Sequence, residues 1–297
     1  MDANGDMGLS QSEAEPARWR ELRRRTVSAL VIAPIAVAAI IAGETSALVL
    51  ITLAGCAMAW EVWRMATAKA DGPDRLLAPG RRGATKLAIV IGPALGVALA
   101  ALVDFRAALA FAAAFGLFGA WRAKRRDGAR GETSLWLGLG GGLVIAAAAA
   151  LADLRLDAGG VFIALWLIAV VAAADTGAYL FGRMIGGPKL WPRVSPKKTW
   201  AGLIAALICG GAAAAAALAL NQAAVSVIAV VCGVLAAAAG QAGDLAESAF
   251  KRRFNRKDAS GLIPGHGGVL DRMDSLVGAT LVVALARAAG IDMWSAS

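Results

Sequence analysis

Residues 248–274 read SAFKRRFNRKDASGLIPGHGGVLDRMD and form the longest polar interruption in an otherwise apolar carboxyl-terminal half. Apolar runs that are long enough for membrane helices border this stretch, near residues 223–243 and 271–291. A polar segment between two such helices becomes a loop at the membrane surface. The sequence therefore predicts two helices that carry this segment into the aqueous phase.

The composition is that of a membrane protein. The chain has 297 residues, of which 59% are hydrophobic and only 17% are charged, and its mean hydropathy is +0.65. These values lie outside the range of soluble globular domains and predict an all-α, polytopic integral membrane protein. The net charge of +9 does not indicate nucleic-acid binding, because the basic residues form short clusters between apolar runs.

Two features that resemble functional motifs are better explained by packing. Cys56, Cys209 and Cys232 lie inside apolar runs without CxxC spacing, so we expect small core residues instead of a zinc or redox site. The run GLGGG at residues 138–142 lacks the strand and the full spacing of a dinucleotide-binding loop. Small residues in an apolar run predict close contact between helices.

Nine apolar runs are long enough to cross a bilayer, given that a membrane helix needs about 17–25 residues. They lie near residues 27–42, 46–65, 86–103, 105–121, 134–152, 159–181, 199–220, 223–243 and 271–291. Residues 1–25 are polar and end in a cluster of arginines. We expect them to form a disordered basic cytoplasmic tail before an uncleaved first helix.

The distribution of positive charge predicts the orientation of these helices. The chain has 30 lysines and arginines, and all but three fall in the amino-terminal tail or in four of the predicted loops. These loops lie near residues 64–86, 122–130, 183–198 and 251–272. In a nine-helix topology they share one side, which the positive-inside rule assigns to the cytoplasm. The amino terminus and residues 248–274 are therefore expected on the cytoplasmic side.

Two pairs of carboxylates border the segment 248–274. Asp244 and Glu247 are spaced i, i+3 before it, and Asp271 and Asp274 have the same spacing at the start of the last run, so each pair shares a helical face. If the two helix ends meet, the carboxylates form an oxygen-only ligand set, which suits Mg²⁺. Solvated helix caps are the alternative for either pair alone.

Two further polar residues are functional candidates. Asp175 lies inside the sixth apolar run, where a carboxylate is costly unless it is paired or bound to a metal; a helix-end ion pair is the alternative. His266 is the only histidine and is flanked by glycines, which allow a ligand to approach the backbone closely. Its ring can bind phosphate or move a proton, although a lone histidine is more often structural.

Side chains that suit phosphate contacts lie in the two late cytoplasmic loops. They are Ser195, Lys197, Lys198, Ser248, Lys251, Arg252, Lys257 and Arg272. Asp258 lies between these basic residues and is a further candidate site residue. Basic side chains bind phosphate oxygens, and backbone N–H groups at a helix start favour an anion. Anionic lipids attract the same residue types to the membrane surface, so both explanations stay open.

At these separations the residues of the segment resemble the signature of the phosphatidate cytidylyltransferase family, whose members are also called CDP-diacylglycerol synthases. The matching residues are Ser248, Lys251, Arg252, Lys257, Asp258, Pro264, His266, Gly267, Gly268, Asp271, Arg272 and Asp274. Weaker similarity extends upstream through Asp175 with Thr176 and Gly177, Gly182 with Arg183, and the SPKKTWAG segment at 195–202. The first 150 residues resemble the family only in hydropathy.

The resemblance implies a membrane enzyme of phospholipid biosynthesis, with residues 26–297 as one transmembrane catalytic domain. The Ala- and Arg-rich composition indicates a bacterial source, for which the membrane is the cytoplasmic one. Its reaction would convert CTP and phosphatidic acid into CDP-diacylglycerol and pyrophosphate with Mg²⁺, in a homodimer. Asp244 and Asp271 would bind the metal, with Glu247 and Asp274 beside them, and Lys251 and His266 would act in catalysis. Contacts to phosphates would come from the basic and serine side chains of the two loops, and Asp175 and Asp258 are further candidates.

Other functions remain alternatives at this point. A CTP-dependent transferase that acts on another lipid phosphate shares these features, and a second cation beside Mg²⁺ is not excluded. A cation-coupled transporter also has polar residues in membrane helices, but repeat symmetry is expected of it and the acidic residues here cluster late in the chain. The D-G-x-x-A-R opening of CDP-alcohol phosphotransferases is absent.

Overall fold

The structure is a computed structural model that describes residues 31–67, 79–125, 128–223, 225–263, 265 and 267–291. An apolar helix, Val31–Ala42, comes first. The elements that follow are α2 (Glu44–Thr67), α3 (Pro79–Leu102), α4 (Phe105–Lys124), α5 (Gly128–Leu156), α6 (Gly160–Met184), β1 (Lys189–Trp191), β2 (Ser195–Thr199), α7 (Trp200–Leu220), α8 (Val227–Arg253) and α9 (Leu270–Ala288). The predicted tail, residues 1–25, lies outside the described residues.

Each of the nine predicted apolar runs coincides with a helix, and the prediction of an all-α polytopic membrane protein is confirmed. Within the described residues, five helices are long and apolar enough to cross a membrane: α2, residues 131–156 of α5, α6, α7 and α8. The apolar helices Val31–Ala42 and Lys86–Leu102 are shorter. The count of nine spans and the cytoplasmic amino terminus therefore stay predictions.

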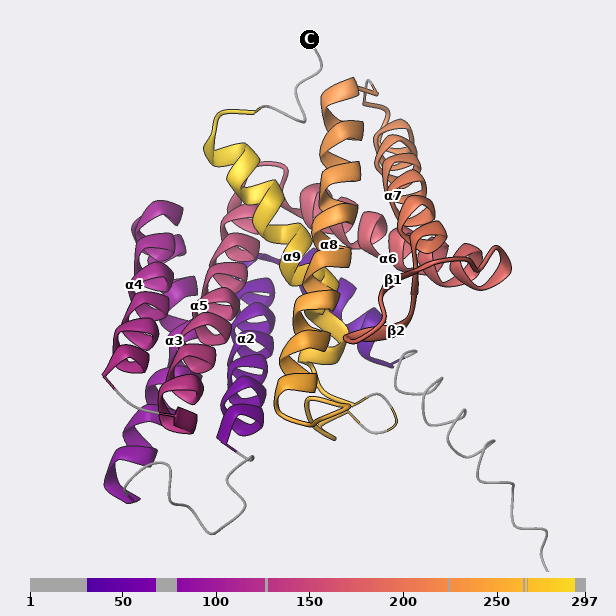
Figure 1. Ribbon diagram of the computed structural model, residues 1–297. Coiled ribbons are helices and arrows are strands. Elements are labelled where there is room, and N and C mark those ends of the chain that lie inside the picture. Colours follow the sequence, from indigo (N-terminus) through magenta and orange to yellow (C-terminus); the bar gives the residue numbers. More distant parts are fainter. Residues whose placement is uncertain are drawn as a thin grey trace, which may run out of the picture.

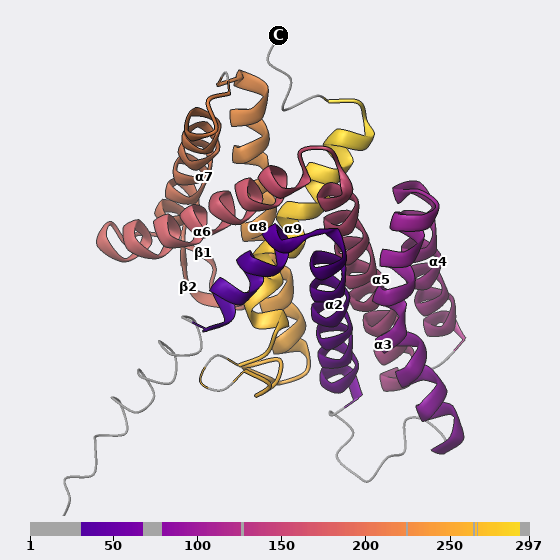
Figure 2. The same ribbon diagram turned by 180° about the vertical axis from the view of Figure 1, so that it is seen from behind.

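The helices form two groups that meet at α9. Helices α2 to α5 pack against one another, as do α6, α7 and α8, and α9 contacts members of both groups. Figures 1 and 2 show this division from opposite sides, with α9 between the groups. The core reflects the same arrangement, because Val283 of α9 belongs to the cluster around Trp166 of α6, whereas Val277 belongs to the cluster around Met58 of α2.

One element was not expected from the sequence. The loop between α6 and α7 forms an antiparallel hairpin in which Lys189 lies opposite Thr199 and Trp191 opposite Ser195. The β2 sequence SPKKT lacks the alternation of apolar and polar residues that predicts a strand. Thr199 ends the hairpin and begins α7, because its side chain accepts a hydrogen bond from Gly202 N at 3.1 Å. Lys197 and Lys198 therefore lie on a strand before the helix.

Glycines bring neighbouring helices into backbone contact. A Cβ atom on Gly278 of α9 would lie 2.1 Å from Ala239 O of α8, and one on Gly243 would lie 2.4 Å from Asp274 O. Between α4 and α5, a Cβ on Gly138 would lie 2.6 Å from Gly119 Cα, which confirms the packing role predicted for the glycine run. Close approach through small residues is the usual basis of helix association in membranes.

The contact between α8 and α9 leads to a stability prediction. Gly278→Ala places a methyl group where the carbonyl of Ala239 lies, so the two backbones must separate. We expect the free energy of unfolding to fall by about 1–3 kcal/mol, the usual cost of overpacking. Thermal unfolding of the purified protein in detergent measures this change.

Gly261→Ala is the matched control, because nothing lies within 4 Å of a Cβ atom built at Gly261. Its unfolding midpoint should equal that of the unmodified protein. An unchanged midpoint for Gly278→Ala would contradict the backbone contact between α8 and α9.

Candidate metal centre

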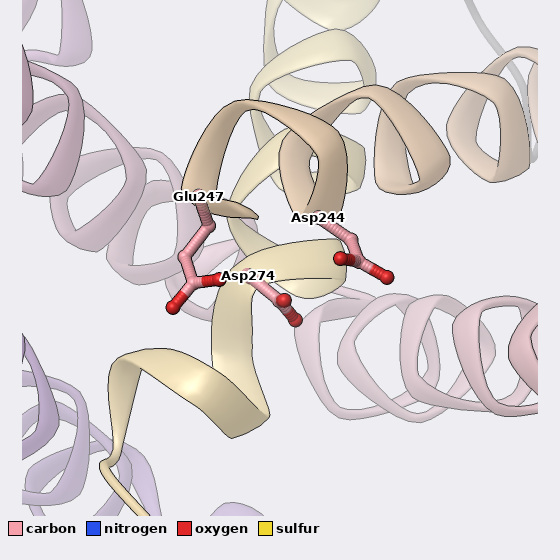
Figure 3. Close-up of side chains that lie close together, drawn as sticks. All are labelled: Asp244, Glu247 and Asp274. Atoms are coloured by element: carbon pink, nitrogen blue, oxygen red, sulfur yellow. The ribbon is translucent and has the colours of Figure 1, made fainter. Parts of the chain in front are cut away.

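Three carboxylates from two helices lie together at the contact between α8 and α9. Asp244 and Glu247 of α8 and Asp274 of α9 each offer an oxygen atom, and these atoms all lie within 4.8 Å of one another. Figure 3 shows the three side chains extending from the two helices toward the same region. Glu247 is buried, with 6% of its surface exposed. The close approach at Gly243 and Gly278 makes this meeting possible.

The donor set fits a hard divalent cation. All three groups are carboxylates, and oxygen-only ligation suits Mg²⁺ or Ca²⁺ better than zinc, copper or iron. Carboxylates placed this close repel one another unless cations neutralise them. Two lysines supply part of that charge: Lys198 Nζ lies 2.8 Å from Asp244 Oδ2, and Lys251 Nζ lies 2.6 Å from Glu247 Oε2.

Lys198 of strand β2 connects the carboxylate group to Asp175 of α6 through Gln241. Lys198 Nζ also donates to Gln241 Oε1 at 3.1 Å. Gln241 Nε2 in turn donates to Asp175 Oδ1 at 2.8 Å, and the Ser275 hydroxyl donates to the same oxygen at 3.3 Å. Asp175 is thus joined to Asp244 through Gln241 and Lys198, so one polar network links β2, α6, α8 and α9.

Lys251 connects the carboxylate group to the loop between α8 and α9. Besides Glu247, it contacts Asp271 Oδ1 at 2.7 Å. Asp271 Oδ2 accepts hydrogen bonds from Gly268 N at 2.7 Å and from Ala259 N at 3.0 Å. The carboxylate of Asp271 thus holds the loop against α8, one lysine away from the three grouped carboxylates. Its role as a metal ligand stays a prediction.

The glycines of the loop make room for carboxylates. Gly267 has a φ of +85°, a region that favours glycine, and a Cβ atom there would lie 2.7 Å from Asp271 Oδ2. The sequence suggested that these glycines allow a ligand to approach the backbone. In the structure, the group that approaches Gly267 is Asp271 of the protein itself.

The other predicted residues lie at varying distances from this centre. Ser248 is adjacent, because its hydroxyl donates to Asp244 Oδ1 at 3.3 Å. Arg252 donates to Arg256 O at 3.2 Å and is exposed. Four more predicted residues are exposed: Lys197, Lys257, Asp258 and Arg272; Ser195, on β2, is half-buried. His266 and Pro264 lie outside the described residues.

Several polar residues of the site were missed in the sequence, among them Ser275, whose hydroxyl donates to Asp175. Gln241, 4% exposed, bridges Lys198 and Asp175. Glu61 of α2 is fully buried and accepts hydrogen bonds from the loop before α9. The signal for Glu61 was present, because it is a carboxylate inside an apolar run, the criterion that identified Asp175.

A sequence model of the cytidylyltransferase family matches residues 23–289, which is most of the chain. The chain belongs to this family. The match includes both helix groups and all three grouped carboxylates. It therefore extends the family relationship into the amino-terminal half, where the sequence showed only a similar hydropathy.

Relatives of this cytidylyltransferase family member are named phosphatidate cytidylyltransferase. The protein of Brucella suis biovar 1 is 50% identical over 127 residues, which are 40% of this chain and 44% of the relative. Those of Staphylococcus aureus (strain COL) and Staphylococcus haemolyticus are 45% and 43% identical over 115 and 114 residues, each match covering 38% of this chain and 44% of the relative. The aligned region thus spans less than half the length of these relatives.

The carboxylate geometry predicts a divalent cation site that can be tested without turnover. Asp274→Asn removes one charged oxygen ligand from the three, and carboxylate sites lose affinity as their charge falls. We expect Mn²⁺, used as a paramagnetic probe, to bind at least about tenfold more weakly. Electron paramagnetic resonance of free Mn²⁺ during titration of the purified protein measures the affinity.

Asp104→Asn is a matched control, because Asp104 caps α4 outside the polar network and asparagine also caps helices well. Its Mn²⁺ affinity should not change. Asp271→Asn in the same titration tests the predicted ligand role of Asp271. Equal affinity in Asp274→Asn and the unmodified protein would rule out Asp274 as a ligand.

Proposed function

We propose that the protein is a phosphatidate cytidylyltransferase, which transfers the cytidylyl group of CTP to phosphatidic acid and releases pyrophosphate. The observation that carries the proposal is the group of Asp244, Glu247 and Asp274 with Lys198 and Lys251 against it. Membership of the cytidylyltransferase family and the names of the relatives support the same reaction.

The chemistry needs charge neutralisation more than a strong base. A phosphate oxygen of phosphatidic acid attacks the α-phosphorus of CTP, a P–O bond forms, and the bond to the pyrophosphate oxygen breaks. The nucleophile is already an anion, so no proton has to be removed from it. The two substrates repel each other, and the site must hold them in line while negative charge moves to the leaving group.

Mg²⁺ is the cation that we propose for this site. Asp244, Glu247 and Asp274 would hold it, with Asp271 as a further predicted ligand. A bound Mg²⁺ would supply charge neutralisation for the triphosphate and for the departing pyrophosphate. A second cation is compatible with Asp175, which lies in the same polar network.

The lysines have two tasks in this proposal. Lys198 and Lys251 reduce the repulsion among the carboxylates in the structure described here, and their ammonium groups would contact phosphate oxygens when substrates bind. The exposed side chains of Arg252, Lys257 and Arg272 supply further positive charge at the same end of α8 and α9. On β2, Lys197 adds a positive charge and Ser195 offers a hydroxyl group, and His266 belongs to the sequence between α8 and α9.

We place the site at the cytoplasmic face of the bacterial inner membrane. The carboxyl-terminal ends of α2, α4 and α8 and the amino-terminal ends of α3, α5 and α9 lie at one end of the molecule (Figure 1). In the sequence, predicted basic loops follow these three carboxyl-terminal ends, and positive charge is retained on the cytoplasmic side. CTP would reach the site from water and phosphatidic acid from the bilayer. The proposal includes a homodimer, which rests on the family resemblance alone.

The decisive test is product analysis. The purified protein in detergent is mixed with CTP labelled at the α-phosphorus, Mg²⁺ and phosphatidic acid, and lipid-soluble label and pyrophosphate are measured. We expect both products in equal amounts. Parallel reactions with an isoprenoid phosphate test the alternative acceptor, and an absence of pyrophosphate with every lipid phosphate would refute cytidylyl transfer.

Lys198→Met provides a residue-level prediction. Loss of the ammonium group removes the ion pair with Asp244 Oδ2, at 2.8 Å, and removes a positive charge that would contact a substrate phosphate. Removing one electrostatic group from an active site typically lowers kcat by about 100-fold or more, and we expect that size of effect. Initial rates of pyrophosphate release measure it.

Lys189→Met is the control for this substitution, since Lys189 is an exposed lysine of the partner strand β1. It should retain the kcat of the unmodified protein. If both variants lost activity equally, the hairpin as a whole, and not the Lys198 ammonium group, would be responsible.

A further inference from the structure

Glu61 is a buried carboxylate of α2 that binds the start of α9. None of its surface is exposed. Its Oε1 atom accepts hydrogen bonds from Val269 N at 3.0 Å and from the Ser260 hydroxyl at 2.5 Å, and its Oε2 atom accepts one from Leu270 N at 2.7 Å. A residue of the amino-terminal helix group therefore contacts the loop between α8 and α9 at two places, Ser260 and the start of α9.

Within the described residues, the N-cap position of helix α9 provides no side-chain cap. Val269, at the N-cap position, has helical backbone angles and makes no side-chain cap hydrogen bond. The first N–H groups of a helix need an acceptor, and a carboxylate is the most favourable one because of the helix dipole. Glu61 supplies that acceptor from another helix, to Val269 N and Leu270 N.

The space for this carboxylate is provided by Gly268. A Cβ atom at Gly268 would lie 2.6 Å from Glu61 Oε1 and 2.8 Å from its Cδ atom. Any larger residue at this position would displace the carboxylate. The two neighbouring glycines of the loop thus accommodate different acids: Gly267 faces Asp271, and Gly268 faces Glu61.

We propose that Glu61 is a positioning residue for the metal centre. It fixes the first turn of α9, which carries Asp271, and thereby sets where Asp274, one turn further, meets Asp244 and Glu247. Glu61 does not belong to the three grouped carboxylates and acts through the backbone of α9. Its expected effect on activity rests on the proposed function, whereas its effect on cation binding does not.

Glu61→Gln in the full-length protein tests this role. The amide keeps the size of the side chain, but it cannot accept at both terminal atoms, so one N–H group of α9 loses its partner. Substitution of a residue that orients metal ligands typically costs about 10- to 100-fold in metal affinity. We expect Mn²⁺ binding to weaken by that factor, with faster amide hydrogen exchange confined to residues 268–273.

Two control variants separate positioning from general stability. Glu44→Gln makes the same chemical change at an exposed position of α2 and should leave Mn²⁺ affinity and exchange unchanged. Gly268→Ala leaves Glu61 in the chain but displaces its carboxylate, so it should weaken Mn²⁺ binding as Glu61→Gln does. The double variant should be no weaker than either single one, because both remove the same interaction.

The outcomes distinguish this inference from the proposed function. If folded Glu61→Gln and Gly268→Ala proteins bound Mn²⁺ with the affinity of the unmodified protein, Glu61 would serve stability only and the inference would be wrong. If Glu61→Gln did not fold, Gly268→Ala would decide by the same measurement. A protein that binds Mn²⁺ in a Glu61-dependent way but transfers no cytidylyl group would refute the proposed function and support the inference.

Discussion

The backbone contact between α8 and α9 is the constraint on which the rest of the structure depends. At Gly243 and Gly278 the two helices approach more closely than any side chain would allow. Because of this approach, Asp274 lies next to Asp244 and Glu247, with no side chain between the two helices at this point. Helix α9 also belongs to both apolar clusters, so the position of this contact is determined by both helix groups. The geometry of the three carboxylates and the packing of α8 against α9 are therefore determined together.

Charge compensation explains how three carboxylates share so small a space. Lys198 and Lys251 approach them from different elements, one from the hairpin and one from α8 itself. Each lysine also contacts a second partner, Gln241 or Asp271, which fixes the ammonium group in place. Removing one member of such a network leaves a buried charge without its partner, which is costly. In the proposed reaction between two polyanions, the same lysines would supply positive charge.

The sequence predicted the parts of this site that depend on local spacing. The i, i+3 pairs Asp244 with Glu247 and Asp271 with Asp274 lie on helices, as their spacing indicates, and the apolar runs coincide with helices. The sequence could not distinguish the two members of the second pair. Asp274 joins the carboxylate group while Asp271 holds the loop, because the crossing of α8 and α9 decides which face meets which. The contribution of Glu61 depends on a contact between residues about 200 positions apart, which no local pattern reveals.

That long-range contact has a consequence for biogenesis. Glu61 emerges from the ribosome and enters the membrane with α2, whereas Val269 and Leu270 are synthesised only after six further long helices. Until then, a carboxylate within an apolar helix lacks the hydrogen-bond donors of the finished protein, and such a group is costly in a bilayer. Arrival of α9 satisfies this carboxylate and assembles the acidic cluster in the same step. Insertion of the last helix is therefore coupled to completion of the acidic cluster.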